Sequence, residues 1–260
     1  MRLTVRDVYD WINEIAPFET AESYDNVGLL IGSMGSEVSK ILVALDATPA
    51  VVDEAKKLKA ELIITHHPLM FRGTKRILDD DYEGAVIISL IREKINLIAA
   101  HTNLDLSPEY SGSIGLVKAL HLENIRQEGF LYLGELPDAP VSAGELRKRI
   151  SSCEKDLVYQ FGTDDAQITT LCISGGAYDE GFERARALGA QAYLTGEVRH
   201  HNALAAIGTG FVLYQGGHYG TEALLVPLLA QGLQSRLDML KYDVTVFVSQ
   251  CRPYGGSASC

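Results

Sequence analysis

The feature that most constrains the fold is a strand–helix–strand pattern that occurs twice at a fixed spacing. In its first occurrence, apolar strands are expected at 40–46 and 62–65, with a helix at 49–58 between them. Pro49 suits the first turn of that helix because its fixed φ is already helical. Such a unit implies parallel strands joined by a right-handed crossover, and it places the chain in the α/β class.

The second occurrence lies 130 residues further along the chain. Strands are expected at 170–174 and 191–195, and a helix at 180–188. Any two α/β units resemble each other to some degree, but a gapless match of about 25 positions favours a duplicated unit. The aligned pairs include Ile41 with Leu171, Ala55 with Ala185, Leu58 with Leu188, Ala60 with Ala190 and Thr65 with Thr195.

The duplication predicts two similar α/β lobes, each with a mixed sheet flanked by helices. We assign residues 1–125 to the first lobe and 126–260 to the second. Within them, the more polar segment 106–169 could be an inserted layer or an oligomer contact. The first lobe is expected to open with a helix that Thr4 caps and that Pro17 ends.

Composition limits the possible partners and the compartment. The formal net charge of −11 argues against nucleic acid and anionic membranes as partners, since both require clustered Lys and Arg. The four cysteines form no CxxC, which favours a reducing cytoplasm. The segment 1–7 lacks the apolar stretch expected of a signal peptide, and no apolar run approaches the roughly 20 residues expected of a membrane span. The Gly- and Ser-rich tail from Cys251 is expected to be mobile.

A histidine doublet ends the second strand of the first unit. His66 and His67 directly follow 62–65, and Pro68 then stops the strand pairing. In an extended segment, adjacent side chains point to opposite sides, so the two imidazoles are expected to diverge. One metal ion could not easily take both rings, whereas two neighbouring ions could take one each.

Each lobe also has a strand followed by a His-x-x-x-acid sequence. These strands are expected at 96–100 and 211–214. Since the carboxyl ends of parallel strands meet at one edge of a sheet, we expect a dinuclear metal site at the strand ends between the lobes. The candidate metal ligands are His66, His67, Asp105, His218 and Glu222, with His101 as a ligand or orienting partner and Glu197 in reserve.

Imidazole with carboxylate suits Zn, Fe, Mn or Ni better than Ca or Mg. Two such ions per subunit would lower the pKa of a bound water from about 16 towards 7.

Several residues outside the candidate metal site are assigned no role in metal binding. Arg72 and Lys75 could contact a phosphate or be ordinary loop charges. We expect solvated side chains at His121, His200 and His201, a turn cap at Asp25 and Asn26, and a strand-to-helix turn at Gly175 and Gly176.

Five motifs occur in order along the chain: Tyr24–Leu29, Thr65–Leu69, Ala100–Asp105, Thr195–Glu197 and Gly217–Glu222. Taken together, they resemble the motifs of the NGG-interacting-factor-three-like family, whose members are often labelled GTP cyclohydrolase I type 2 homologues. The resemblance covers nearly the whole chain and is weakest at 106–169 and in the tail. One departure is Tyr24, where Trp is frequent.

The resemblance implies a two-lobed α/β subunit with a dinuclear metal site. It also implies a ring-shaped homohexamer whose metals face an inner cavity. The implied metal ligands are His66, His67, Asp105, His218 and Glu222, with His101 close by.

The leading hypothesis is therefore a metal-dependent hydrolase that acts on a nucleotide. A metal-bound hydroxide would attack C8 of GTP, and His101 or Glu197 would move protons. The alternative is a non-catalytic metal-binding or regulatory hexamer. Nucleic-acid binding in the ring's cavity is disfavoured by the net charge of −11.

Overall fold

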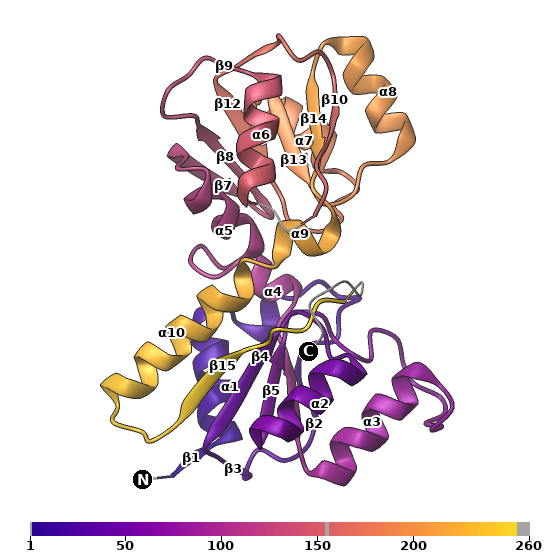
Figure 1. Cartoon of the computed structure of the whole chain (residues 1–260), viewed down its shortest axis with the longest axis vertical. Coiled ribbons are helices and arrows are strands. Elements are labelled where there is room, and N and C mark those ends of the chain that lie inside the picture. The colour runs from indigo at the N-terminus through magenta and orange to yellow at the C-terminus, as the bar shows by residue number, and fades with distance from the viewer. Residues whose placement is uncertain (1, 154–155, 254–260) are drawn as a thin grey trace. The chain divides into compact units, whose positions relative to one another are not determined.

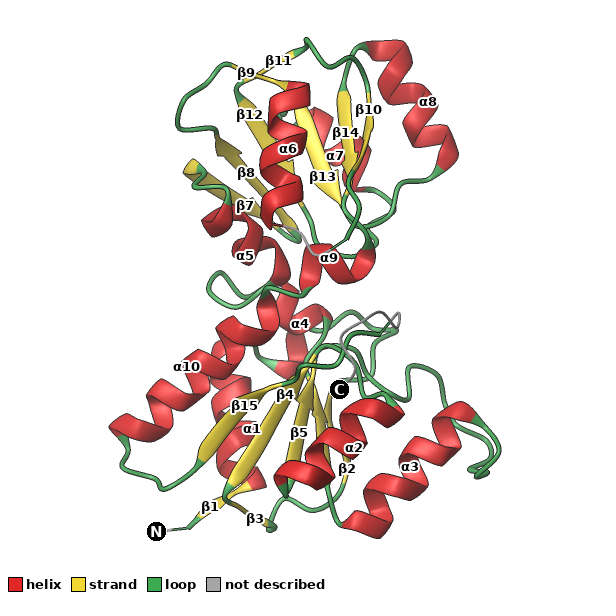
Figure 2. Cartoon of the chain, viewed as in Figure 1, coloured by secondary structure: helices red, strands yellow, loops and turns green. Residues whose placement is uncertain are grey.

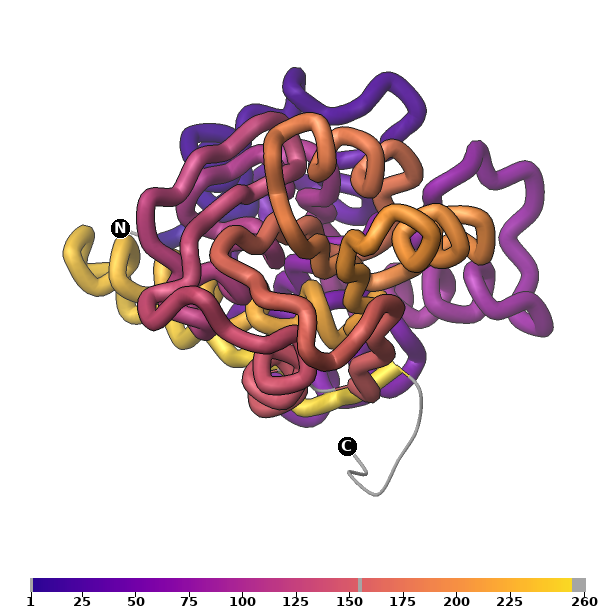
Figure 3. Tube along the Cα trace, turned by 90° about the horizontal axis from the view of Figure 1, so that it is seen from above, coloured from indigo at the N-terminus to yellow at the C-terminus, as the bar shows by residue number. Residues whose placement is uncertain are grey.

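The computed structural model describes residues 2–153 and 156–253, and the chain divides into two compact units. Unit 1 comprises Met1–Ser107 and Val226–Cys260, and unit 2 comprises Pro108–Leu225. These bounds differ from the predicted division after residue 125 in two ways. Residues 108–125 belong to unit 2, and the C-terminal part of the chain, yellow in Figure 3, belongs to unit 1, where Thr245–Val248 pairs with residues 40–43. Most of the tail that was expected to be mobile lies outside the described residues.

Unit 1 contains a five-stranded mixed sheet and a two-stranded ladder. The strands are β1 (Leu3–Thr4), β2 (Gly28–Ile31), β3 (Glu37–Val38), β4 (Lys40–Ala44), β5 (Leu62–Thr65), β6 (Asn96–Ala99) and β15 (Thr245–Val248). The main sheet has the order β15-β4-β5-β6-β2, in which the first four strands are parallel and β2 is antiparallel (Figure 1). The ladder joins β1 to β3.

Three helices of unit 1 begin at a residue whose side chain caps them, namely Thr4, Thr48 and Asp81. At Thr4, the hydroxyl accepts from the Asp7 amide and the Asp7 carboxylate accepts from the Thr4 amide, which confirms the predicted start of the first helix. That helix ends at Ile15, two positions before Pro17. The predicted helix 49–58 is also confirmed, with Thr48 as its cap. The helices are α1 (Val5–Ile15), η1 (Phe18–Thr20), α2 (Pro49–Leu58), α3 (Tyr82–Glu93), α4 (Thr102–Asp105) and α10 (Leu225–Met239).

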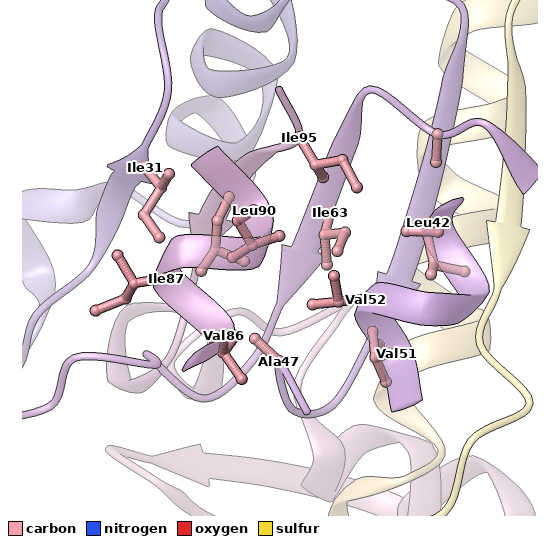
Figure 4. Close-up of a cluster of buried hydrophobic side chains, with 14 residues drawn as sticks. Ile31, Leu42, Ala47, Val51, Val52, Ile63, Val86, Ile87, Leu90 and Ile95 are labelled. Carbon is pink, nitrogen blue, oxygen red and sulfur yellow. The ribbon is translucent and has the colours of Figure 1, made fainter. Parts of the chain in front are cut away.

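One face of the unit 1 sheet packs against α2 and α3. Leu42 and Ile63 point from the sheet towards Val52 on α2 and Leu90 on α3, and all four side chains are nearly inaccessible to solvent (Figure 4). Burying an aliphatic side chain of this size contributes about 1.5–3 kcal/mol. Helices lie on both sides of the sheet, as expected for an α/β fold (Figure 2).

Unit 2 contains a six-stranded mixed sheet with the order β10-β14-β13-β12-β8-β7. Its strands are β7 (Glu123–Glu128), β8 (Leu131–Glu135), β9 (Val141–Ser142), β10 (Tyr159–Phe161), β11 (Gln167–Ile168), β12 (Thr170–Ile173), β13 (Ala192–Thr195) and β14 (Val212–Gln215), with β9 and β11 forming a separate ladder. Its helices are α5 (Gly112–Ala119), α6 (Ala143–Cys153), α7 (Gly181–Ala187), α8 (His200–Thr209) and α9 (His218–Glu222). The polar segment 106–169 therefore supplies β7, β8 and β10 to this sheet.

The two units repeat the same arrangement. In both, three parallel strands are followed by one antiparallel edge strand: β4-β5-β6-β2 in unit 1 and β12-β13-β14-β10 in unit 2. The ladders β1-β3 and β9-β11 also correspond. The offset of 130 residues holds at the level of pairing, because Leu42 lies opposite Ile63 and Cys172 lies opposite Tyr193.

Side-chain hydrogen bonds follow the same offset. The Glu61 carboxylate accepts from the amides of Ser39 and Lys40, at 3.1 and 2.9 Å. The Gln191 side-chain oxygen accepts from the amides of Thr169 and Thr170, at 2.6 and 3.2 Å. In each unit, one polar side chain thus ties the start of one strand to the start of the next.

A pair of glycines at this offset provides a stability test. Gly32 and Gly162 have φ values of +112° and +118°, which are strained for any residue with a Cβ. A Cβ at Gly32 would lie 2.1 Å from Oδ1 of Asn96, whereas one at Gly162 would lie 3.3 Å from its nearest neighbours. Asn96 cannot yield easily, because it is buried and bonded to Ser33 and Glu61.

We therefore expect Gly162→Ala to cost about 1–2 kcal/mol through backbone strain alone. Gly32→Ala should cost about 1–3 kcal/mol more, since it adds overpacking to the same strain. Denaturant unfolding followed by circular dichroism measures both losses, and the fluorescence of Trp11, the single tryptophan, reports unit 1 separately. Equal losses for the two variants would contradict the account of Gly32.

Candidate metal centre

Three imidazoles gather at the carboxyl ends of β5 and β6 in unit 1. His66 and His67 directly follow β5, and His101 follows β6 two positions after its last residue. Each ring offers a nitrogen that lies within 4.8 Å of those offered by the other two. The parallel pairing of β5 with β6 causes this meeting, because it brings both strand ends to one edge of the sheet.

The expectation that His66 and His67 diverge is wrong. Their ring centroids are 4.9 Å apart, because β5 ends at Thr65 and the chain bends before the doublet. The bend is fixed by two hydrogen bonds. The Thr65 hydroxyl donates to the His67 carbonyl at 2.9 Å, and the His67 amide donates to the Leu45 carbonyl at 3.0 Å. The rule of alternating side chains applies only while the strand continues.

Each of the three rings is held through its Nδ1 atom. His66 Nδ1 lies 3.0 Å from the Ala100 carbonyl, which can only accept. His67 and His101 use carboxylates, with Asp46 Oδ1 at 2.8 Å and Asp25 Oδ1 at 2.9 Å. When Nδ1–H donates in this way, a neutral imidazole carries its lone pair on Nε2, the form that binds a metal ion.

Asp25 is the most strongly supported of these partners. Its side chain is fully buried, and its second oxygen accepts from the amide and the hydroxyl of Thr102 at 3.0 and 2.5 Å. Burial alone raises the pKa of Asp25, but the hydrogen bonds from His101 and Thr102 outweigh it and hold that pKa well below its ordinary value. Asp25 therefore positions His101, a larger role than the predicted turn cap.

Asp105 completes the polar cluster of unit 1. It lies at the end of α4, a single helical turn whose amides at Leu104 and Asp105 donate to the His101 carbonyl. This turn brings Asp105 Oδ1 to 3.6 Å from Nε2 of His66. The carboxylate and the imidazole thus approach each other on the side of His66 opposite its bond to Ala100.

Unit 2 carries the second His-x-x-x-acid sequence on α9. His218 and Glu222 lie one helical turn apart, as predicted, and Nε2 of His218 is 3.3 Å from Oε2 of Glu222. Nδ1 of His218 lies 2.7 Å from Oε1 of Glu197. Glu197 therefore occupies the orienting position that Asp46 and Asp25 occupy in unit 1.

Glycines create the space in which the Glu222 side chain is buried. A Cβ at Gly176 would lie 2.2 Å from Oε1 of Glu222 and 3.3 Å from Nε2 of His218. Cβ atoms at Gly175 and Gly112 would lie 3.1 and 3.3 Å from Cγ of Glu222. The pair Gly175–Gly176, predicted only as a turn, also shapes the pocket around the carboxylate.

The donor set fits a divalent transition metal. It combines imidazole and carboxylate groups, which suit Zn, Fe, Mn or Ni. The Glu222 carboxylate is buried beside the His218 imidazole, and a metal ion there would offset the cost of removing a negative charge from water. Within the described ranges, His121, His200 and His201 are exposed and belong to no such group, in agreement with their prediction as solvated side chains.

Asp46 is the site residue that the sequence reasoning missed. It follows β4 by two positions, so it reaches the same sheet edge as the histidines. The acid at the end of the predicted strand 40–46 was a usable signal, since metal-bound histidines commonly donate their second N–H to a carboxylate.

Comparison with known proteins identifies the family of this chain. The family model Duf34/NIF3 (NGG1p interacting factor 3) matches residues 3–254. A curated relative from Clostridium acetobutylicum, named GTP cyclohydrolase 1 type 2 homolog, is 30% identical over 96% of this chain and 97% of its own length. A relative of the same name from Streptomyces coelicolor is 33% identical over 94% of this chain and 90% of its own.

Solved structures show the same fold. The hypothetical protein SA1388 of Staphylococcus aureus aligns with a TM-score of 0.90 and 28% identity over 98% of this chain and all of its own. Reduced HcgD from Methanocaldococcus jannaschii aligns with a TM-score of 0.81 and 23% identity over 95% of this chain and 98% of its own, a likeness of fold alone. The family model covers nearly the whole chain, so this protein belongs to the Duf34/NIF3 (NGG1p interacting factor 3) family.

Proposed function

We propose that this protein holds two divalent metal ions and uses them for hydrolysis. The observation that carries the proposal is the cluster of three imidazoles in unit 1, each fixed through Nδ1. Each unit carries imidazole and carboxylate donors for such ions after its strand ends. The proposed ligands are His66, His67 and Asp105 from unit 1 and His218 and Glu222 from unit 2.

The chemistry would be attack by water on an electrophilic carbon. The ions would supply an acidified water as the nucleophile and would stabilise negative charge on the substrate. His101 and Glu197 are the residues proposed to move protons, since each is an ionisable group beside the ligands. The names of the curated relatives suggest a specific substrate, GTP, whose imidazole ring would open at C8.

The second candidate is a non-catalytic metal-binding or regulatory protein. Unit 1 alone offers three imidazoles and the Asp105 carboxylate, enough to saturate one ion in a closed, structural site. This candidate predicts tight metal binding without turnover, so the two functions are separable by experiment.

Assembly, location and origin are further parts of the proposal. We propose a ring-shaped homohexamer, as the family resemblance implies, and a cytoplasmic location, which the cysteine pattern favours. In the described ranges, no helix has the length and apolar character needed to cross a bilayer. We also infer that the units arose by duplication, supported by their shared strand order and by the matched hydrogen bonds of Glu61 and Gln191.

Substitution of Gly176 tests the metal site without removing any ligand. A methyl group there would displace the Glu222 carboxylate, so Gly176→Ala should weaken zinc binding by about 10- to 100-fold. Gly210→Ala is the matched control, because Gly210 also has a positive φ but has no atom within 4 Å of its Cβ position. Competition with a chromophoric chelator measures both affinities, and equal affinities would contradict a role for Glu222 in metal binding.

The hydrolase proposal predicts that protein reloaded with Fe, Mn or Zn releases formate from GTP. His67→Ala should abolish the release, because it removes a proposed ligand, whereas His201→Ala should leave it unchanged, because His201 is exposed on α8. Formate is measured by a coupled dehydrogenase assay against a metal-only control. No formate above that control with all three metals would rule out GTP as the substrate.

A further inference from the structure

We propose that Tyr24 and Phe71 form a binding subsite for a planar heteroaromatic ring beside the histidine cluster of unit 1. The inference rests on the proposed function, because it names the class of substrate that the same site would take. A nucleobase is the commonest biological group of this shape. The evidence is the exposure of the two aromatic side chains, their distance from His101 and the hydrogen bonds that hold their backbone.

Both aromatic side chains are exposed to solvent. Tyr24 is 61% exposed and Phe71 is 44% exposed, although rings of this size normally contribute to stability by burial. Their centroids are 6.1 Å apart and their planes are inclined at 56°. The two rings therefore form an open corner, in which a flat ligand can stack on one ring and meet the other at its edge.

The corner lies next to the candidate metal ligands. The Phe71 ring stands edge-on to the His101 ring, with centroids 6.1 Å apart and planes inclined at 77°. His101 in turn lies 5.0 Å from His66 and 5.4 Å from His67, measured between ring centroids. The corner therefore adjoins the histidine cluster through the contact of Phe71 with His101.

One three-residue segment holds this arrangement together. Tyr24 supplies a ring, and its neighbour Asp25 accepts from His101 at 2.9 Å. Asn26 donates from its side chain to the Met70 carbonyl at 2.6 Å, and from its amide to Asp25 at 2.8 Å. The backbone beside Phe71 is thus tied to the segment that positions His101. Groups fixed before binding lose little entropy when a ligand arrives.

The chemistry of the corner selects a ring and not a phosphate. An aromatic side chain offers a face on which any base can stack, so this contact tolerates different bases. The loop that follows Phe71 offers no net charge for an anion. Its cations Arg72, Lys75 and Arg76 are balanced by three carboxylates at 79–81.

The test compares two probes on the zinc-loaded protein by isothermal titration calorimetry. Guanosine has a base without phosphate, and ribose 5-phosphate has a phosphate without a base. Guanosine should bind, and Phe71→Leu should weaken it by about tenfold, since leucine keeps the apolar bulk but lacks a π face. Phe71→Trp should retain or tighten guanosine binding.

Two controls separate stacking from general damage. Phe71→Leu should leave the binding of ribose 5-phosphate unchanged. Tyr159→Leu removes an aromatic ring that is 54% exposed on β10 in unit 2, and it should leave guanosine binding unchanged.

The subsite is overturned if guanosine fails to bind, or if it binds Phe71→Leu and the unaltered protein equally. Formate release from GTP that is insensitive to Phe71→Leu would also overturn the subsite while sustaining the hydrolase. Guanosine binding that depends on Phe71, in a protein that releases no formate, would sustain the subsite and count against the hydrolase.

Discussion

Parallel pairing of β4, β5 and β6 is the constraint on which the rest of the site depends. The pairing places Ala44 beside Thr65 and Thr65 beside Ala99, so all three strands end at one edge. The residues that follow those ends then meet. They are Asp46, the doublet His66–His67 and His101. The Asp46 carboxylate lies within hydrogen-bonding distance of His67, and the His101 ring contacts the rings of His66 and His67. The apolar strands make this edge rigid by burial on both faces.

The same strand arrangement gives the two units different chemistry. The position equivalent to His66 in unit 2 is Gly196, where a Cβ would lie 2.6 Å from the Gly176 carbonyl and 2.9 Å from Cα of His218. A histidine therefore cannot replace Gly196, because the backbone of α9 and of the Gly176 turn occupies the space. Unit 2 instead supplies its donors from α9, one turn of which separates His218 from Glu222.

Much of this fold follows from apolar patterning and capping. The helix 49–58 and the strands 62–65 and 192–195 have the predicted type and nearly the predicted bounds, since their apolar runs and Thr or Pro starts are local signals. The exposed, polar strand β7 gives no such signal, because its identity comes from its hydrogen bonds to β8. The return of β15 to unit 1 is likewise a long-range choice of partner that no local pattern encodes.

The identity of the candidate site residues was largely predictable, whereas their mutual orientation was not. Histidines and acids after apolar strands identify one sheet edge. The bend at His66–His67 depends on a hydrogen bond from the Thr65 hydroxyl to the His67 carbonyl. It also depends on contacts of His67 with Leu45 and Asp46, which lie at the end of a separate strand. Such contacts become visible only once the strands are paired.

Anomalous X-ray diffraction at the zinc edge, from crystals of the zinc-loaded protein, would show directly which residues hold metal ions. We expect two zinc peaks, each about 2.0–2.2 Å from imidazole nitrogen or carboxylate oxygen atoms. Those atoms should belong to His66, His67, Asp105, His218 and Glu222. A single peak, or peaks at other residues such as the exposed His200 and His201, would contradict the claim that these five residues hold a pair of metal ions.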